Sequence, residues 1–192
     1  TATSGAIKQG HSASSIKGGT VTLSSTSYGS STASLGINSR NLTAITAGSG
    51  VGAYFQSTGS ELGVANVTTN GGVIAINGDN VTLNLRNLVS GGGNITVETG
   101  GTSNLRVGDI NAAGLSGKGN VTLTASSGSI QDDGLTSTVV NGNTVLFSAN
   151  SGIGSSSNAI ATNANILMGN NSGNGSVYIN DSNSAGVSLG DV

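Results

Sequence analysis

The sequence predicts an all-β solenoid, and three observations lead to that fold class. Short runs alternate apolar and polar residues, as in Val121-Thr122-Leu123, which places the apolar side chains on one face of an extended segment. These runs recur with a period of about 20–26 residues, a length that is typical of one coil of a solenoid. Gly, Asn and Ser separate the runs. The chain contains no proline, which suits strands that are hydrogen-bonded on both sides.

The spacing of the runs defines the expected coils. Val21, Leu42 and Val64 begin three runs at nearly equal intervals, and the series resumes after a wider interval. Its later members are Ile95, Val121, Val145, Ile166 and Val187. Second runs follow some of these within the same period. We therefore expect eight or nine coils, about 40 Å long at the usual strand spacing, in a single unit over residues 1–192 that is less regular over 1–60.

Composition restricts the function classes. Only 7% of the residues are charged and 3% are aromatic, so Ser, Thr, Asn and Gly must solvate the surface and the core must be aliphatic. The net charge of −2 does not indicate the basic surface that binding to nucleic acid requires. The basic residues look scattered along the chain: Lys8, Lys17, Arg40, Arg86, Arg106 and Lys118. Regularly spaced Val, Ile and Thr argue against disorder.

The corners between strands leave one alternative fold open. Gly and Asn suit tight corners, and Asn side chains stacked at equivalent corners are expected to hydrogen-bond along the axis. Four Asn-Gly pairs are also typical of two-residue hairpins, which keeps an antiparallel sandwich repeat in consideration. They are Asn70-Gly71, Asn77-Gly78, Asn141-Gly142 and Asn174-Gly175.

Cellular context follows only partly from the residues. The absence of cysteine excludes a disulfide framework and a Cys metal site, and it suits a chain that crosses an envelope unfolded. No run approaches the roughly 18 apolar residues of a membrane helix, so we expect no membrane insertion. Residues 1–10 do not form a signal peptide. We expect the chain to be a segment of a longer protein.

Residues 119–192 resemble the repeat region of the filamentous haemagglutinin family of large secreted exoproteins. The resemblance lies in the stretches 119–125, GNVTLTA, 128–134, GSIQDDG, 153–162, IGSSSNAIAT, and 175–179, GSVYI. Residues 64–114 share this style, notably 104–110, NLRVGDI, whereas 1–60 do so only loosely. Where family members commonly have Pro after the Asn at 158, this chain has Ala159.

The resemblance implies a right-handed parallel β-helix that is exported by two-partner secretion, through a dedicated outer-membrane transporter. It also implies an adhesin that is secreted or held at the bacterial cell surface, with this segment as part of its shaft. Host-cell or matrix glycans or proteins are the implied binding partners.

Acidic residues are the first candidates for chemistry, because many β-helix proteins cleave polysaccharides. Asp132-Asp133 is a candidate acid–base pair or calcium site, although its position beside Gly134 favours a solvated corner. Other acids are candidates to converge across coils: Glu61, Glu98, Asp79, Asp109, Asp181 and Asp191. Lyase chemistry would also need a stacked arginine, which Arg86 and Arg106 are able to supply.

The remaining candidates have simple structural interpretations. His11 is the only histidine and is expected at the surface, and Gly78-Asp79-Asn80 matches a turn better than a calcium repeat. Asn-x-Ser/Thr occurs at Asn41, Asn66, Asn80, Asn94, Asn120, Asn170, Asn174 and Asn180, which makes glycosylation a hypothesis. An outward hydroxyl stripe, suited to binding ice or glycans, would require Thr22, Thr82, Thr96, Thr122 and Ser188 to align.

The sequence therefore predicts a structural shaft segment that extends or presents the binding regions of a large adhesin. We expect no enzyme, and we assign no catalytic residue, cofactor or metal ligand. Two alternatives remain at this point: a β-helix that binds or cleaves polysaccharide, and a sandwich-type adhesin repeat.

Overall fold

The computed structural model describes residues 5–135 and 138–190, and it is built from β-strands. The strands are β1 (Ile16–Ser25), β2 (Leu35–Ser49), β3 (Ala53–Ser57), β4 (Glu61–Asn70), β5 (Ile74–Gly78), β6 (Thr82–Val89), β7 (Ile95–Thr99), β8 (Leu105–Asn111), β9 (Ala113–Gly114), β10 (Gly117–Lys118), β11 (Val121–Ala125), β12 (Ile130–Asp132), β13 (Val140–Ala149), β14 (Ile160–Asn171), β15 (Ile179–Asp181) and β16 (Ser188–Leu189). In the described part of the chain, no helix is long and apolar enough to cross a membrane.

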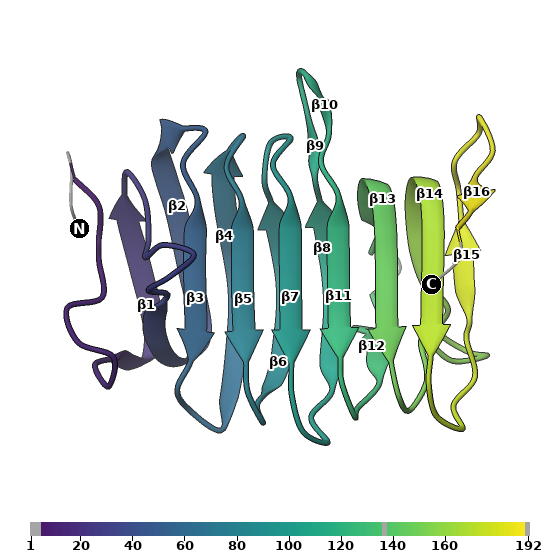
Figure 1. Ribbon diagram of the computed structural model, residues 1–192, viewed down its shortest axis with the longest axis horizontal. Helices are drawn as coiled ribbons and strands as arrows, with labels where there is room; N and C mark the ends of the chain where they lie inside the picture. Colours follow the sequence, from purple (N-terminus) through teal and green to yellow (C-terminus); the bar gives the residue numbers. More distant parts are fainter. Residues whose placement is uncertain (1–4, 136–137, 191–192) are drawn as a thin grey trace.

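The chain winds into a solenoid of about eight coils, and strands of successive coils pair in parallel. Figure 1 shows β3, β5, β7 and β11 running down the front while β2, β4, β6 and β8 run up behind them. Because the coils advance from left to right in that view, the winding is right-handed. The predicted right-handed parallel β-helix is confirmed.

The core consists of columns in which each inward side chain stacks on the equivalent residue of the next coil. One column lies on the front wall and contains Ala53, Ile74, Ile95, Val121, Val145, Leu167 and Leu189. The numbers of successive members differ by between 21 and 26, which confirms the expected repeat length. The rear column contains Val21, Leu42, Val64, Leu85 and Val107.

The wide interval between Val64 and Ile95 in the predicted series has a structural cause. Val64 belongs to the rear column and Ile95 to the front column, so the series changes walls at this point and no coil is unusually long.

One of the last two expected members of the series, Ile166, is wrong, because its neighbour Leu167 takes the inward position and stacks on Val145, whereas Ile166 pairs with Thr144 and is 38% exposed. Val187 packs against the core, and Leu189 pairs with Leu167 in the last described coil but is 80% exposed. A run of apolar residues does not itself reveal which member faces inward.

Each long rear strand bends once, and this bend gives the coil a third side. In β4, Leu62 and Val64 are buried, the alternation is interrupted at Ala65 and Asn66, and Val67 is buried next. The register of β2 against β4 shifts at the same place. The outward face of the first half of each rear strand therefore forms a separate wall, which carries the candidate site described below.

Glycine and asparagine occupy the corners between strands, as the sequence predicts. Gly72, Gly93 and Gly119 stack so closely that a Cβ at Gly93 would lie 2.2 Å from the carbonyl oxygen of Gly72. An asparagine ladder at one corner joins five coils through side-chain hydrogen bonds; it contains Asn94, Asn120, Asn143, Asn165 and Asn183. The predicted axial asparagine hydrogen bonding is confirmed.

The antiparallel sandwich alternative is wrong. Asn141-Gly142 lies inside the parallel strand β13, and Asn70-Gly71 forms a corner of the coil. The antiparallel pair β9–β10 is a small hairpin that projects from one coil and carries the fully exposed Leu115 (Figure 1). Asn70-Gly71 acts as a corner because neighbouring coils, and not a hairpin partner, share its backbone hydrogen bonds: the Gly71 N–H donates to the Ser90 carbonyl, and the Asn70 carbonyl accepts from the Gly50 N–H.

One inward column changes from apolar to polar at its C-terminal end. Val67, Leu88, Ile110 and Val140 are followed in register by Thr162 and then by Asp181. The Asp181 carboxylate accepts hydrogen bonds from Thr162 Oγ1 at 2.7 Å and from the backbone N–H groups of Ala164 and Asn183, both at 3.0 Å. Partial burial opposes ionisation, but these bonds and the charge of Lys118 outweigh it and hold the pKa of Asp181 below its usual value.

The column stacking predicts the cost of a core truncation. Leu88 is fully buried between Val67 and Ile110, so Leu88→Ala should lower the free energy of unfolding by about 2–5 kcal/mol. Leu115→Ala is the matched control, because Leu115 is exposed and its truncation should change stability by less than about 0.5 kcal/mol. Urea unfolding followed by circular dichroism measures both. Equal effects of the two variants would contradict the proposed core.

Asp181 predicts a pH dependence of stability. A carboxyl group whose folded-state pKa is lowered stabilises the fold above its unfolded pKa of about 3.9, and this contribution is lost as the pH falls through the lower folded pKa. Asp181→Asn should therefore lower stability at pH 6 and make the decline between pH 5 and pH 3 shallower. Urea unfolding at several pH values tests this. An unchanged slope in the variant would show that Asp181 does not contribute.

Candidate functional site

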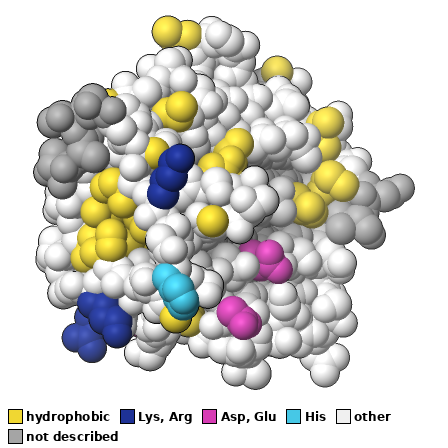
Figure 2. All heavy atoms as spheres, turned by 60° about the vertical axis from the view of Figure 1, so that its left-hand side comes forward, with side chains coloured by type: hydrophobic (Ala, Val, Ile, Leu, Met, Phe, Trp, Pro, Cys, Tyr) yellow, Lys and Arg dark blue, Asp and Glu magenta, His cyan; other side chains and the backbone are white. Residues whose placement is uncertain are grey.

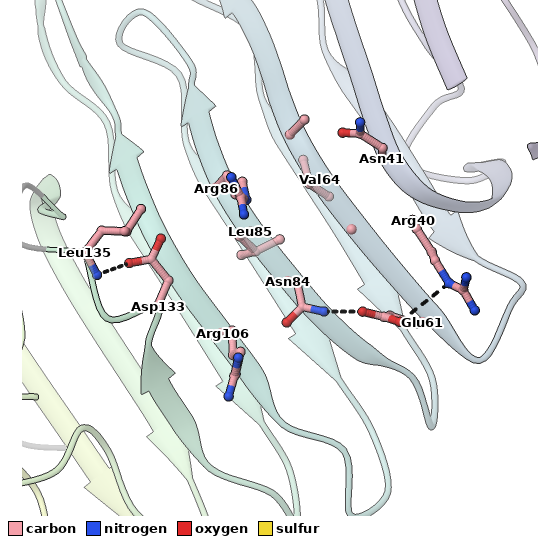
Figure 3. A pocket seen from close by; sticks show the side chains of 12 residues that line it. Arg40, Asn41, Glu61, Val64, Asn84, Leu85, Arg86, Arg106, Asp133 and Leu135 are labelled. Atoms are coloured by element: carbon pink, nitrogen blue, oxygen red, sulfur yellow. Dashed lines mark hydrogen bonds and ion pairs between the residues drawn. The ribbon is translucent and has the colours of Figure 1, made fainter. Parts of the chain in front are cut away.

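A hollow of about 380 Å³ lies on the outward wall formed by the first halves of the rear strands (Figure 3). We name it the arginine groove and define it by Arg40 of β2, Glu61 of β4, Asn84 and Arg86 of β6, Arg106 of β8 and Asp133 of the loop after β12. The groove crosses several coils, so its side chains come from distant parts of the sequence. Leu135, which is 59% exposed, borders the groove on the side of that loop.

The groove is hollow because small residues form part of its floor. Gly63 pairs with Asn84, and Asn84 pairs with Arg106, so these three positions form one outward column. A Cβ at Gly63 would lie 1.9 Å from the carbonyl oxygen of Arg40. The close approach of β2 and β4 therefore requires glycine at this position, which leaves space above the backbone between the longer side chains.

The three arginines of the chain all line this groove. The arginines are scattered along the sequence, as expected, but the fold brings them together in space, so the expectation that they are not clustered is wrong for arginine. Figure 2, in which the N-terminal side comes forward, shows few charged side chains on that face, where uncharged groups cover most of the surface. The clustering is distinctive in a chain with six Lys and Arg residues in total.

A polar network orders one end of the groove. Asn84 Nδ2 donates a hydrogen bond to Glu61 Oε1 at 2.6 Å, and Arg40 Nε lies 4.0 Å from Glu61 Oε2. The Arg40 side chain is 85% exposed, so the ion pair itself contributes little to stability. The amide of Asn84 nevertheless fixes the Glu61 carboxylate against the wall.

Asp132 ends β12 and Asp133 begins the loop after it, close to the predicted turn, but their carboxylates serve the loop and do not form an acid–base pair. Asp132 Oδ1 accepts a hydrogen bond from the Gly134 N–H at 2.7 Å, and Asp133 Oδ1 accepts from the Leu135 N–H at 3.0 Å. Burial, together with the neighbouring charge of Asp133, raises the pKa of Asp132. Asp133 lines the arginine groove, whereas Asp132 lines a separate hollow beside Asn180.

Glu61 lies in the arginine groove with Asp133, whereas the other predicted acids do not join them. Asp109 accepts a hydrogen bond from the Val139 N–H at 3.0 Å, Glu98 faces outward from β7 on the front wall, and Asp79 lies in the turn after β5. Asp181 closes the inward column described above, and Asp191 lies outside the described residues. Among the residues that the structure describes, no group of three or more His, Cys, Asp or Glu side chains is placed to hold a metal ion.

The remaining candidates lie apart from the groove, with one exception. His11 is exposed, as expected, and its Nδ1 accepts a hydrogen bond from the Ala13 N–H at 3.4 Å. Among the Asn-x-Ser/Thr positions, Asn41 lines the arginine groove and Asn94 and Asn120 belong to the asparagine ladder. Asn66 accepts a hydrogen bond from Asn87 Nδ2 at 2.7 Å. Glycosylation of these positions remains a prediction.

The proposed hydroxyl stripe does not form. Thr96 and Thr122 are paired neighbours on the front wall. Thr22, Thr82 and Ser188 lie in other columns, where they pair with Thr43, Glu61 and Ile166. The expectation is wrong because the same short pattern occurs on both walls of the coil.

In comparisons with known proteins, no protein-family model, no curated protein and no solved structure matches the chain. The arginine groove is a part of the described surface on which positive charge and hydrogen-bonding amides come together.

Proposed function

We propose that this chain is a shaft segment of a large bacterial adhesin that is secreted or displayed at the cell surface. Its role is mechanical: it extends or presents binding regions. The observation that carries the proposal is the continuity of the stack, in which the front column runs from Ala53 to Leu189. Stability in such a solenoid comes from each coil's contacts with its neighbours, so the shape is set by stacking and suits a rod.

Three further features support the proposal that this rod bears force and is exported across an envelope. The inter-coil backbone hydrogen bonds run along the axis, and the asparagine ladder runs parallel to them at an exposed corner. The core is mainly aliphatic, with Tyr28, Phe55 and Phe147 as its largest fully buried side chains. The chain contains neither cysteine nor proline, so no disulfide or slow proline isomerisation would delay folding after passage through an outer-membrane transporter.

A polysaccharide-cleaving enzyme is the weaker candidate. Cleavage requires an acid and a base positioned around one bond. Glu61 and Asp133 both line the arginine groove, but Glu61 is held by Asn84 and Arg40, and Asp133 accepts hydrogen bonds within its own loop from the Leu135 N–H and Thr138 Oγ1. Binding without cleavage requires only the groove, and it is compatible with a place on a shaft.

The shaft proposal predicts the nature of the native protein. Peptide mapping of the native protein from its source should place this sequence in a chain several times heavier than 18.4 kDa, with further coils of similar spacing. Protease treatment of intact cells should release its peptides. A native chain close to 18.4 kDa, or one retained inside the cell, would contradict the proposal.

A further inference from the structure

We propose that the arginine groove binds an anionic polysaccharide through its carboxylate groups, with Arg86 and Arg106 as the carboxylate-binding pair. The proposal concerns a specific surface of the chain and does not depend on the shaft role. Arg86 and Arg106 come from the neighbouring strands β6 and β8, so both side chains project from one wall of paired strands. Figure 3 shows them between the Asp133 loop on one side and Asn84 and Glu61 on the other.

The positive charge of this pair is available to a ligand. Among the described residues, the one ion pair joins Arg40 to Glu61, and the guanidinium groups of Arg86 and Arg106 donate no hydrogen bond to a described side chain or carbonyl. The two acids of the groove are already engaged. Glu61 is held by Asn84 and Arg40, and Asp133 accepts hydrogen bonds from the Leu135 N–H and from Thr138 Oγ1 at 2.9 Å.

The chemistry of the lining favours a carboxylated glycan. A guanidinium group matches a carboxylate with two parallel N–H donors, and a pair of them surrounds one carboxylate or two successive ones. The side-chain amides of Asn41 and Asn84 provide donors and acceptors for sugar hydroxyl groups beside the pair. Because the groove crosses parallel coils at a spacing of about 4.8 Å, it presents these groups as a ladder to an extended polymer.

Two other polymers fit the groove less well. A peptide that adds a strand needs an unpaired sheet edge, but β4, β6 and β8 are paired on both sides within the wall. Single-stranded nucleic acid is held mainly by stacking on aromatic side chains, and the lining of the groove contains none. The test below includes both kinds of polymer as comparison probes.

The groove is open and the charges are solvated, so each carboxylate contact is weak and a polymer is held by several contacts at once. Salt should therefore weaken binding. The groove should also prefer a carboxylate polymer to a sulfate polymer of the same charge density, because a planar guanidinium fork pairs with a planar carboxylate in two parallel bonds.

The test measures the affinity of the full chain for polygalacturonate, with dextran sulfate, neutral dextran, a single-stranded oligonucleotide and an extended acidic peptide as comparison probes. Replacing both arginines, in Arg86→Gln with Arg106→Gln, should weaken polygalacturonate binding about tenfold. The pair Arg86→Lys with Arg106→Lys keeps the charge but removes the planar fork, and it should recover part of the affinity at most. Circular dichroism of each variant confirms that the solenoid is intact.

Lys8→Gln is the matched control, because Lys8 is exposed and lies outside the groove. It should leave polygalacturonate binding unchanged. Three results would overturn the proposal: equal losses in the control and in the arginine variants, equal or tighter binding of dextran sulfate, the oligonucleotide or the peptide, or unchanged binding after both arginines are replaced. Binding of neutral dextran at the affinity of polygalacturonate would overturn it as well.

Discussion

In-register stacking of equivalent residues in successive coils is the interaction on which the rest of this structure depends. An inward side chain such as Leu88 is buried because Val67 lies on one side of it and Ile110 on the other. The same register lets each coil form hydrogen bonds with the backbone N–H and C=O groups of its neighbours. A narrow rod with few large side chains has no other partners for these groups where they are buried. Packing of the core and hydrogen bonding between coils therefore depend on the same register.

This constraint explains why the coils tolerate insertions. The hairpin β9–β10 lengthens one coil, and residues 133–135 and 154–159 lie in loops outside two later coils, yet the inward columns resume in register after each of them. Such insertions cost little because they leave the stacked positions unchanged. They also build surface features, since the loop that contains Asp133 forms one side of the arginine groove.

The sequence predicts the coil length and the asparagine ladder because each inward or corner position must repeat with the coil. It does not reveal which wall a run belongs to, and this is why the predicted Thr stripe is wrong. It also does not reveal which member of a continuous apolar run faces inward, and this is why the inward placement of Ile166 is wrong. The arginine cluster does leave a signal in the sequence. Arg106 follows Arg86 by close to one coil length, and Arg86 follows Arg40 by close to two. Spacing by the coil length brings residues together in space, so scanning charged residues at that period finds the groove.

Outward positions in this fold are free of the stacking constraint, so their side chains are the ones that can be specialised. A shaft needs an outer surface that is soluble and inert, and uncharged Ser, Thr and Asn side chains meet that need over most of the described surface. Arginine is not needed for solubility here, and each of these long side chains carries a conformational cost when a ligand orders it. Three arginines on one wall, beside a glycine that keeps the floor open, are therefore better explained by a ligand than by solvation. With the proposed shaft role, such a groove would let the rod both extend a binding region and bind an anionic polysaccharide along its length.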